Sequence, residues 1–164
     1  MPVVPTEPVK ISIVSSPSIL PVIRPAVDKL CRLVGFDETC AGGIVLAVDE
    51  ALANIIEHAY DGRQDQPIEV TLTPRMTAGV ATGLEVGLRD FGRVVDPCVI
   101  RGRPLEDVRP GGLGVHIMRS CMDEVEYIHP QEGGTLLRMG KRLPASSSPG
   151  SAGSPKKAGE PQHG

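Results

Sequence analysis

The chain has 164 residues and a formal net charge of −3, which suits one domain of ordinary size and argues against direct binding of nucleic acid. Its four cysteines are widely spaced and form neither a C-x-x-C motif nor a Cys/His zinc pattern. The N-terminus lacks the features of a leader peptide, and no uninterrupted apolar stretch approaches about 20 residues. We therefore expect a cytoplasmic protein that does not bind a membrane.

The first predicted elements are a strand and a helix. Clean alternation of apolar and polar residues predicts a strand over 9–14. A helical segment follows from Ser18 to Val34, and Pro21 and Pro25 predict that this helix starts late or is kinked.

The next helix carries the most informative pattern of the sequence. Asp37 is placed to cap it, and it is expected to stop near Asp61 and Gly62. At about 100° per residue, its apolar side chains share one broad face, and its polar side chains gather on the flank beside that face. The apolar set is Ile44, Val45, Val48, Ala51, Leu52, Ile55, Ile56 and Ala59, and the polar set is Glu50, Asn54, Glu57 and His58.

Glu50 and Asn54 lie one helical turn apart on that flank. Such a carboxylate suits the acceptance of a proton, and such a carboxamide offers a neutral oxygen to a hard cation. The alternative is an amphipathic helix whose polar edge only faces water, and an isolated E-x-x-x-N match favours that alternative.

Two strands, 68–73 and 84–90, come next along the chain. Residues 92–112 then contain Gly, Arg and Pro without a convincing period. This segment is long for a passive connection, so we interpret it as a functional loop.

A short helix over 115–122 precedes a hairpin of strands 124–129 and 135–141. The element order predicts an α/β (α+β) two-layer sandwich, with a mixed, mainly antiparallel sheet and helices on one face. The folded domain would span residues 9–142. Residues 143–164 are dominated by Ser, Gly and Pro and are interpreted as a disordered tail.

Asp90 ends a strand that looks buried, where a carboxylate needs a partner. We interpret Asp90 as the acceptor for the exocyclic amine of adenine, which would select ATP over GTP. Gly92 would let the backbone come close to the base. The alternative is an ordinary turn at the end of the strand, which the D-x-G pattern favours by itself.

Gly112, Leu113 and Gly114 open the short helix and offer backbone amides to a phosphate at the positive end of its dipole. A dinucleotide-binding fingerprint is excluded because Ile117 stands where its third Gly should be, and the chain has no P-loop motif. Thr135 is a candidate for a water-bridged contact to adenine. The alternative is that it is simply a β-branched residue with a high strand propensity.

These motifs in this order resemble the GHKL ATPase superfamily and, within it, the bacterial anti-sigma-factor serine kinases. The resemblance runs from about residue 9 to residue 142. One departure is Arg93, which stands where the first glycine box usually has a second Gly. The N box is matched by Glu50 to Asn54 with His58 to Tyr60, the first glycine box by Asp90 to Gly92, and the second by Gly112 to Met118 with Met122 to Val125.

The resemblance implies a GHKL (Bergerat) ATP-binding fold and a role for each matching residue. Asn54 would offer its side-chain oxygen to Mg²⁺ on the ATP phosphates, and Glu50 would be the general base for a serine hydroxyl of a protein substrate. Residues 94–111 would form the ATP lid. Arg101, Arg103 and Arg109 in this lid are candidate phosphate contacts, although a solvated loop is the preferred explanation for any single one of them. Arg93, just before the lid, is a further candidate.

The function that follows from the resemblance is an ATP- and Mg²⁺-dependent protein-serine kinase. It would act as an anti-sigma factor, with a sigma factor and an anti-anti-sigma protein substrate as partners, and would form a homodimer. One alternative is an ATP-dependent protein-binding module with little or no kinase activity. Another is a detached two-component catalytic module, which would transfer phosphate to histidine instead of serine.

Overall fold

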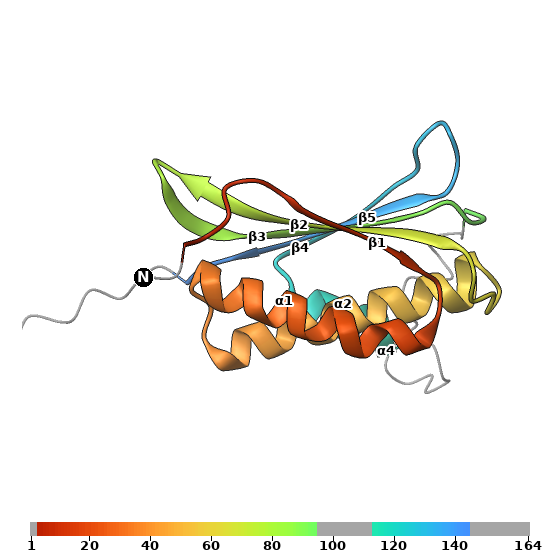
Figure 1. Cartoon of the computed structure of the whole chain (residues 1–164), viewed down its shortest axis with the longest axis horizontal. Helices are drawn as coiled ribbons and strands as arrows, with labels where there is room; N and C mark the ends of the chain where they lie inside the picture. The colour runs from red at the N-terminus through yellow and green to blue at the C-terminus, as the bar shows by residue number, and fades with distance from the viewer. Residues whose placement is uncertain (1–2, 95–112, 145–164) are drawn as a thin grey trace, which may run out of the picture.

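The computed structural model describes residues 3–94 and 113–144. A five-stranded sheet with the strand order β1-β2-β3-β5-β4 forms one layer, and the helices form a second layer on one of its faces (Figure 1). All four pairings between described strands are antiparallel, so the sheet is not mixed in this part of the chain. The predicted two-layer α/β architecture is confirmed. The strands are β1 Val9–Val14, β2 Pro67–Thr77, β3 Val80–Asp90, β4 Glu124–Ile128 and β5 Thr135–Arg142.

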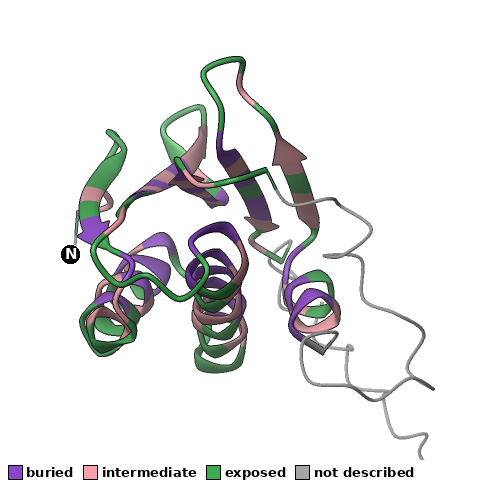
Figure 2. Cartoon of the chain, turned by 90° about the vertical axis from the view of Figure 1, so that its right-hand side faces the viewer, coloured by how far each residue is buried: buried purple, intermediate pink, exposed green. Residues whose placement is uncertain are grey.

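The helical layer places one central helix between two others. Viewed along the layer, α2 lies between α1 and α4, and its buried side faces the sheet (Figure 2). The helical segments are the 3-10 helix η1 Pro17–Ile19, α1 Leu20–Val34, α2 Glu38–Asn54, the π-helix η2 Ile55–Ala59 and α4 Leu113–Cys121.

Helix α1 starts late, as its prolines predict. One 3-10 turn precedes it, and Pro21 occupies its first turn, where a missing backbone N–H costs little. Pro25 lies inside the helix but on its exposed side. The helix ends at Gly35, whose φ of 112° is left-handed and whose N–H donates to the Cys31 carbonyl at 3.1 Å.

Helix α2 begins as predicted, because the Asp37 carboxylate accepts the Cys40 N–H at 2.8 Å. Its apolar face is buried in the core, and η2 extends it into one helical run over Glu38–Ala59. By length and composition alone this run could cross a bilayer, but its apolar face packs on the sheet, as in the core helix of a globular domain. The π turn was not predicted from the sequence.

Strands β2 and β3 extend further than predicted because a two-residue turn joins them. Ala78 and Gly79 both have positive φ, 50° and 79°, which matches the twist of a tight hairpin. Pro74 lies within β2, beyond the last residue, Leu72, that pairs with β1. Its missing N–H is therefore not needed on that side of the strand.

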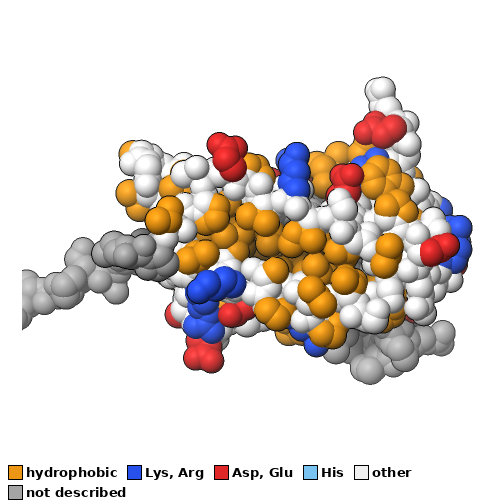
Figure 3. Space-filling view, viewed as in Figure 1, with side chains coloured by type: hydrophobic (Ala, Val, Ile, Leu, Met, Phe, Trp, Pro, Cys, Tyr) orange, Lys and Arg blue, Asp and Glu red, His pale blue; other side chains and the backbone are white. Residues whose placement is uncertain are grey.

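Exposed apolar side chains follow the edge of the molecule formed by β1 and α1. Figure 3 shows them gathered on this side, and Val9, Val14 and Val22 are among the exposed large residues. Strand β1 ends the sheet here, so its outer backbone groups have no strand partner in the described part of the chain. An open edge beside apolar surface is a common site of chain-to-chain pairing.

The turn between β4 and β5 folds back onto the end of β3. Arg89 holds it there, donating to the carbonyl oxygens of Gly133 at 2.6 Å and Asp90 at 2.7 Å. Gly134 has a φ of 68°, and a Cβ at this position would collide with the Asp90 carbonyl oxygen. The position of the Asp90 backbone therefore depends on the absence of a side chain at Gly134.

Replacing Gly134 with Ala is expected to lower the free energy of unfolding by about 3 kcal/mol, through left-handed strain and a backbone collision. Gly133→Ala is the matched control, because Gly133 also has a positive φ but nothing lies within 4 Å of a Cβ there. It is expected to lose only about 1–2 kcal/mol. Urea unfolding of both variants measures the difference, and equal losses would contradict the collision.

Candidate functional site

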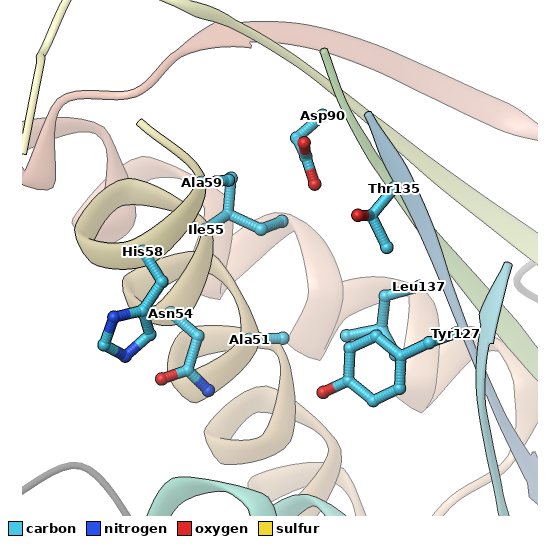
Figure 4. A pocket seen from close by; sticks show the side chains of 9 residues that line it. All are labelled: Ala51, Asn54, Ile55, His58, Ala59, Asp90, Tyr127, Thr135 and Leu137. Atoms are coloured by element: carbon cyan, nitrogen blue, oxygen red, sulfur yellow. The ribbon is translucent and has the colours of Figure 1, made fainter. Parts of the chain in front are cut away.

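A pocket lies between the C-terminal half of the central helix and the inner face of the sheet. It encloses about 400 Å³ of empty space, part of which is open to solvent. Figure 4 shows that helix side chains form one wall and strand side chains form the other. The lining residues are Ala51, Asn54, Ile55, His58, Ala59, Asp90, Tyr127, Thr135 and Leu137.

The walls of this pocket are apolar and the helix side is shallow. Ala51 and Ala59 contribute only methyl groups, with Ile55 between them, and Leu137 faces them from β5 (Figure 4). Two apolar walls with polar groups at the margins suit a flat heterocycle.

The carboxylate of Asp90 closes one end of the pocket. Asp90 is only 2% exposed, and one of its oxygens accepts the Gly92 N–H at 3.0 Å. Thr135, buried beside it, pairs with Asp90 in the ladder between β3 and β5. Burial raises the pKa of Asp90 above its ordinary value, and backbone hydrogen bonds from Gly92 and Thr135 oppose this shift. Its carboxylate points into the pocket (Figure 4), where it can accept a hydrogen bond from a ligand.

Gly92 lets the end of β3 approach the end of the helical run. A Cβ at Gly92 would collide with the Ala59 carbonyl oxygen, which accepts the Arg93 N–H at 3.2 Å. The close approach predicted for Gly92 is therefore made to the helix backbone. Its predicted approach to a base stays a prediction.

Arg93 lies at the C-terminal end of η2. Its Nε donates to the His58 carbonyl at 2.9 Å, and its Nη2 lies 2.6 Å from the Asp61 carboxylate. A cation at a helix C-terminus is favourable. The side chain is largely exposed and is not among the residues that line the pocket, so its phosphate contact stays a prediction.

Glu50, Asn54 and Gly114 meet on the other side of the pocket. Gly114 is the second residue of α4, and a Cβ there would lie 2.7 Å from Glu50 Oε2 and 3.5 Å from Asn54 Nδ2. Residues from two separate motifs of the sequence are thus brought together, because the first turn of α4 lies against the polar flank of α2. Leu113 is the first residue of this helix.

Asn54 carries an unusual buried group. Its Nδ2 is buried and has no hydrogen-bond partner among the residues that the structure describes. Such a group costs about 1–3 kcal/mol and calls for an explanation, of which a bound ligand is one. This unpartnered amide can donate a hydrogen bond to a bound phosphate group. Gly112, Arg101, Arg103 and Arg109 lie outside the described residues.

Two pocket residues with polar side-chain groups were not predicted as site residues. His58 was placed on the polar flank of the helix without a role in the pocket. Tyr127 alternates inward along β4, and the pattern of its strand could have shown that it faces the helices. The alternation does not say which cavity an inward side chain meets, so the pocket role of Tyr127 needed the structure.

Comparison with known proteins agrees with this geometry. The model of the histidine kinase-like ATPase domain matches residues 13–141. The serine-protein kinase RsbW of Halalkalibacterium halodurans is 26% identical over 139 residues, covering 84% of each chain. The RsbW protein of Bacillus cereus is 26% identical over 137 residues, covering 80% of this chain and 82% of the relative.

Two solved structures share the fold. The SiaB-SiaC complex from Pseudomonas aeruginosa contains a chain with a TM-score of 0.61 and 14% identity, covering 80% of this chain and 88% of that one. The RsbU and RsbW domains of Rv1364c from Mycobacterium tuberculosis give a TM-score of 0.56 and 21% identity, covering 86% of this chain and 34% of that one. The predicted GHKL fold is therefore confirmed.

Replacing Asp90 with Asn tests the adenine-reading role. Wild-type protein is expected to bind ATP well above GTP, because guanine presents a carbonyl oxygen where adenine has its amine. Asp90→Asn is expected to weaken ATP binding by about 1.5–3 kcal/mol, through loss of a hydrogen bond to a charged acceptor. Calorimetry measures both, and equal affinities for the two nucleotides would contradict the assignment.

The same variant is expected to change the pH dependence of stability. The folded-state pKa of Asp90 is raised, so its contribution is fully present below the unfolded-chain pKa of 3.8 and is lost as the pH rises through the folded pKa. Asn has no such loss. The free energy of unfolding of Asp90→Asn relative to wild type should therefore rise with pH across this window and then level off. A difference that does not vary with pH in urea titrations would contradict the shift.

Proposed function

Because the chain belongs to the histidine kinase-like ATPase domain family, we propose that it is an ATP- and Mg²⁺-dependent protein-serine kinase that acts as an anti-sigma factor in a partner-switching system. The observation that carries the proposal is the meeting of Glu50, Asn54 and Gly114 beside a pocket that Asp90 closes. Glu50 supplies a proton acceptor and Asn54 a neutral oxygen ligand. Gly114 brings the N-terminus of α4 to them, and Asp90 supplies a hydrogen-bond acceptor for the amine of adenine.

The proposed adenine end of the site is the apolar slot that the buried carboxylate of Asp90 closes. The base would lie between Ala59 and Leu137, with its amine donating to the carboxylate of Asp90. Thr135 would complete this end through a bridging water. The apolar slot favours binding of the flat base, and the buried hydrogen-bond acceptor at its end selects adenine over guanine.

The phosphate end rests on Asn54 and on the first turn of α4. The side-chain oxygen of Asn54 would hold Mg²⁺, and the backbone amides at Gly112, Leu113 and Gly114 would face the phosphates. No cluster of three or more metal-binding side chains occurs in the described part of the chain. This suits a magnesium ion held mainly by phosphates and water. When bound, the ion neutralises the charge of the phosphates.

Glu50 would act as the general base. The serine hydroxyl of the substrate gives its proton to the Glu50 carboxylate while its oxygen forms a bond to the γ-phosphorus. The bond between that phosphorus and the bridging oxygen breaks, and ADP leaves. Glu50 is half-buried beside Gly114, so it lies next to the proposed phosphate site. Phosphoryl transfer depends mainly on such positioning and on charge neutralisation.

The names of the similar proteins support the proposed partners. The relatives at 26% identity are named serine-protein kinases, and one structural neighbour comes from a complex of two proteins. For this chain we therefore propose a sigma factor and an anti-anti-sigma protein as alternative partners, in the cytoplasm. The apolar edge of β1 and α1 would carry the expected homodimer (Figure 3). Light scattering at twice the mass of the chain would support the dimer.

The competing function is an ATP-dependent protein-binding module without phosphotransfer. Arg93 favours the binding module, because Arg93 stands where the first glycine box usually has its second Gly. Its side chain forms an ion pair with Asp61 there. Glu50 favours the kinase, because a binding module needs no proton acceptor beside the phosphate end.

Glu50→Gln and Asn54→Ala separate the two functions. Glu50→Gln keeps the shape of the side chain but removes the proton acceptor. ATP affinity is expected to persist, and transfer to a partner serine should fall by about 10²–10⁴. Asn54→Ala is expected to weaken both, because the proposed magnesium ligand is lost. The assay is radiolabel transfer to a co-purified partner, beside nucleotide binding on the same preparations.

Glu57→Gln is the matched control, since it makes the same chemical change at an exposed position of η2 that does not line the pocket. It should leave binding and transfer unchanged. If wild-type protein binds Mg·ATP but phosphorylates no co-purified partner, the binding-module function should replace the kinase.

A further inference from the structure

The two tyrosines of the chain have opposite surroundings. The hydroxyl of Tyr60 is buried and fully used, because it donates to the Pro67 carbonyl at 2.5 Å and accepts the Phe91 N–H at 2.7 Å. The hydroxyl of Tyr127 has no hydrogen-bond partner among the described residues, and it is not fully buried, so water reaches it when the pocket is empty. Tyr127 is therefore a polar group in a concave site that the chain itself does not satisfy.

The position of Tyr127 directs this hydroxyl into the pocket. Tyr127 lies on β4, paired with Leu137 of β5, and its ring forms part of the strand wall. In Figure 4 the hydroxyl points across the pocket toward Ala51 and Asn54. It therefore faces the phosphate side of the proposed site, whereas Asp90 closes the opposite end.

The sheet register sets the separation between these two polar groups. Thr135 pairs with Asp90, and Leu137, two residues further along β5, pairs with Tyr127. The backbones of Asp90 and Tyr127 are thus about 7 Å apart along the strands and about 10 Å apart across them. A single ligand that contacts both Asp90 and Tyr127 must therefore be longer than one edge of a purine base. A nucleoside has this length.

Tyr127 presents a hydrogen-bond donor at neutral pH. Burial raises the pKa of Tyr127 to about 12, and the nearby Arg119 opposes the shift only in part. The phenol is therefore protonated under ordinary conditions, and it can donate to a ring nitrogen or to a sugar oxygen.

We propose that Tyr127 is a nucleotide-binding residue, whose ring lines the slot for the base and whose hydroxyl donates a hydrogen bond to the bound nucleoside. This inference rests on the proposed function, since it assumes that the pocket holds ATP. It assigns to β4 a contact that the motifs of the sequence do not predict.

Tyr127→Phe is the first test, because it removes only the hydroxyl. ATP binding is expected to weaken about three- to tenfold, the effect of one lost hydrogen bond. The melting temperature should stay the same or rise, since no partner in the described part of the chain loses a bond. A purely structural role predicts the reverse, with a lower melting temperature and unchanged affinity.

Tyrosine fluorescence gives a second readout, because the chain has no tryptophan and only two tyrosines. Tyr60→Phe leaves Tyr127 as the single emitter, and Tyr127→Phe leaves Tyr60. Contact with a purine quenches the emission of a phenol. Titration with Mg·ATP should therefore quench Tyr60→Phe in a saturable way and leave the emission of Tyr127→Phe unchanged, after correction against N-acetyltyrosinamide for absorption by ATP.

The outcomes separate this inference from the function on which it rests. If wild-type protein binds ATP, but Tyr127→Phe binds equally well and the emission of Tyr60→Phe does not respond, the role of Tyr127 is overturned and the ATP site stands. If wild-type protein does not bind ATP in calorimetry, both are overturned. Weaker binding by Tyr127→Phe together with selective quenching of Tyr127 would support both.

Discussion

The site of this protein depends on the burial of one helix face. Helix α2 and its extension η2 must place their apolar side chains against the sheet, and Ile44, Leu52 and Ala51 are almost completely buried there. Once that face is fixed, the helical period also fixes where the polar flank points. Glu50 and Asn54 then border the space between α2 and α4, while Ala51 and Ala59 border the slot under the sheet. The hydrophobic core therefore orients the polar groups of the site as well as stabilising the fold.

Three glycines determine how closely the remaining segments approach this helix and the strand that ends at Asp90. Gly92 brings the end of β3 against Ala59, Gly134 brings the last turn against Asp90, and Gly114 brings the start of α4 to Glu50. Each contact joins segments that are far apart in the sequence, and any side chain at these positions would widen it. The dimensions of the pocket are thus set by approaches of the backbone, which larger residues cannot reproduce.

The sequence was sufficient for the elements whose signals are local. The cap at Asp37, the amphipathic pattern of α2 and the final hairpin depend on neighbours along the chain, and all three are confirmed. Signals that depend on distant segments were missed. The strand predicted over 68–73 in fact runs from Pro67 to Thr77. Nothing in the sequence shows that β1 stops pairing at Leu72, which lets Pro74 lie within β2. The expected phosphate contact of Arg93 did not anticipate its ion pair with Asp61, since the two meet only through the folding of β3 onto η2.

Some of the buried and partly buried polar side chains in this structure have all their hydrogen bonds made within the protein, and others do not. Three whose hydrogen bonds are incomplete lie around the pocket. Ser15 and Tyr60 are buried away from the pocket lining, and each has two backbone partners, so they stabilise the fold without a ligand. Asp90, Asn54 and Tyr127 lie on three different elements and border one cavity. Asp90 keeps acceptor capacity, the buried amide nitrogen of Asn54 has no partner in the described chain, and the partly exposed hydroxyl of Tyr127 has none there either. A domain that satisfies its polar groups elsewhere but leaves three of them incomplete around one cavity is organised for a ligand that completes them. The ligand must accept or donate at both ends and be flat and apolar between them, and this description follows from the side chains alone.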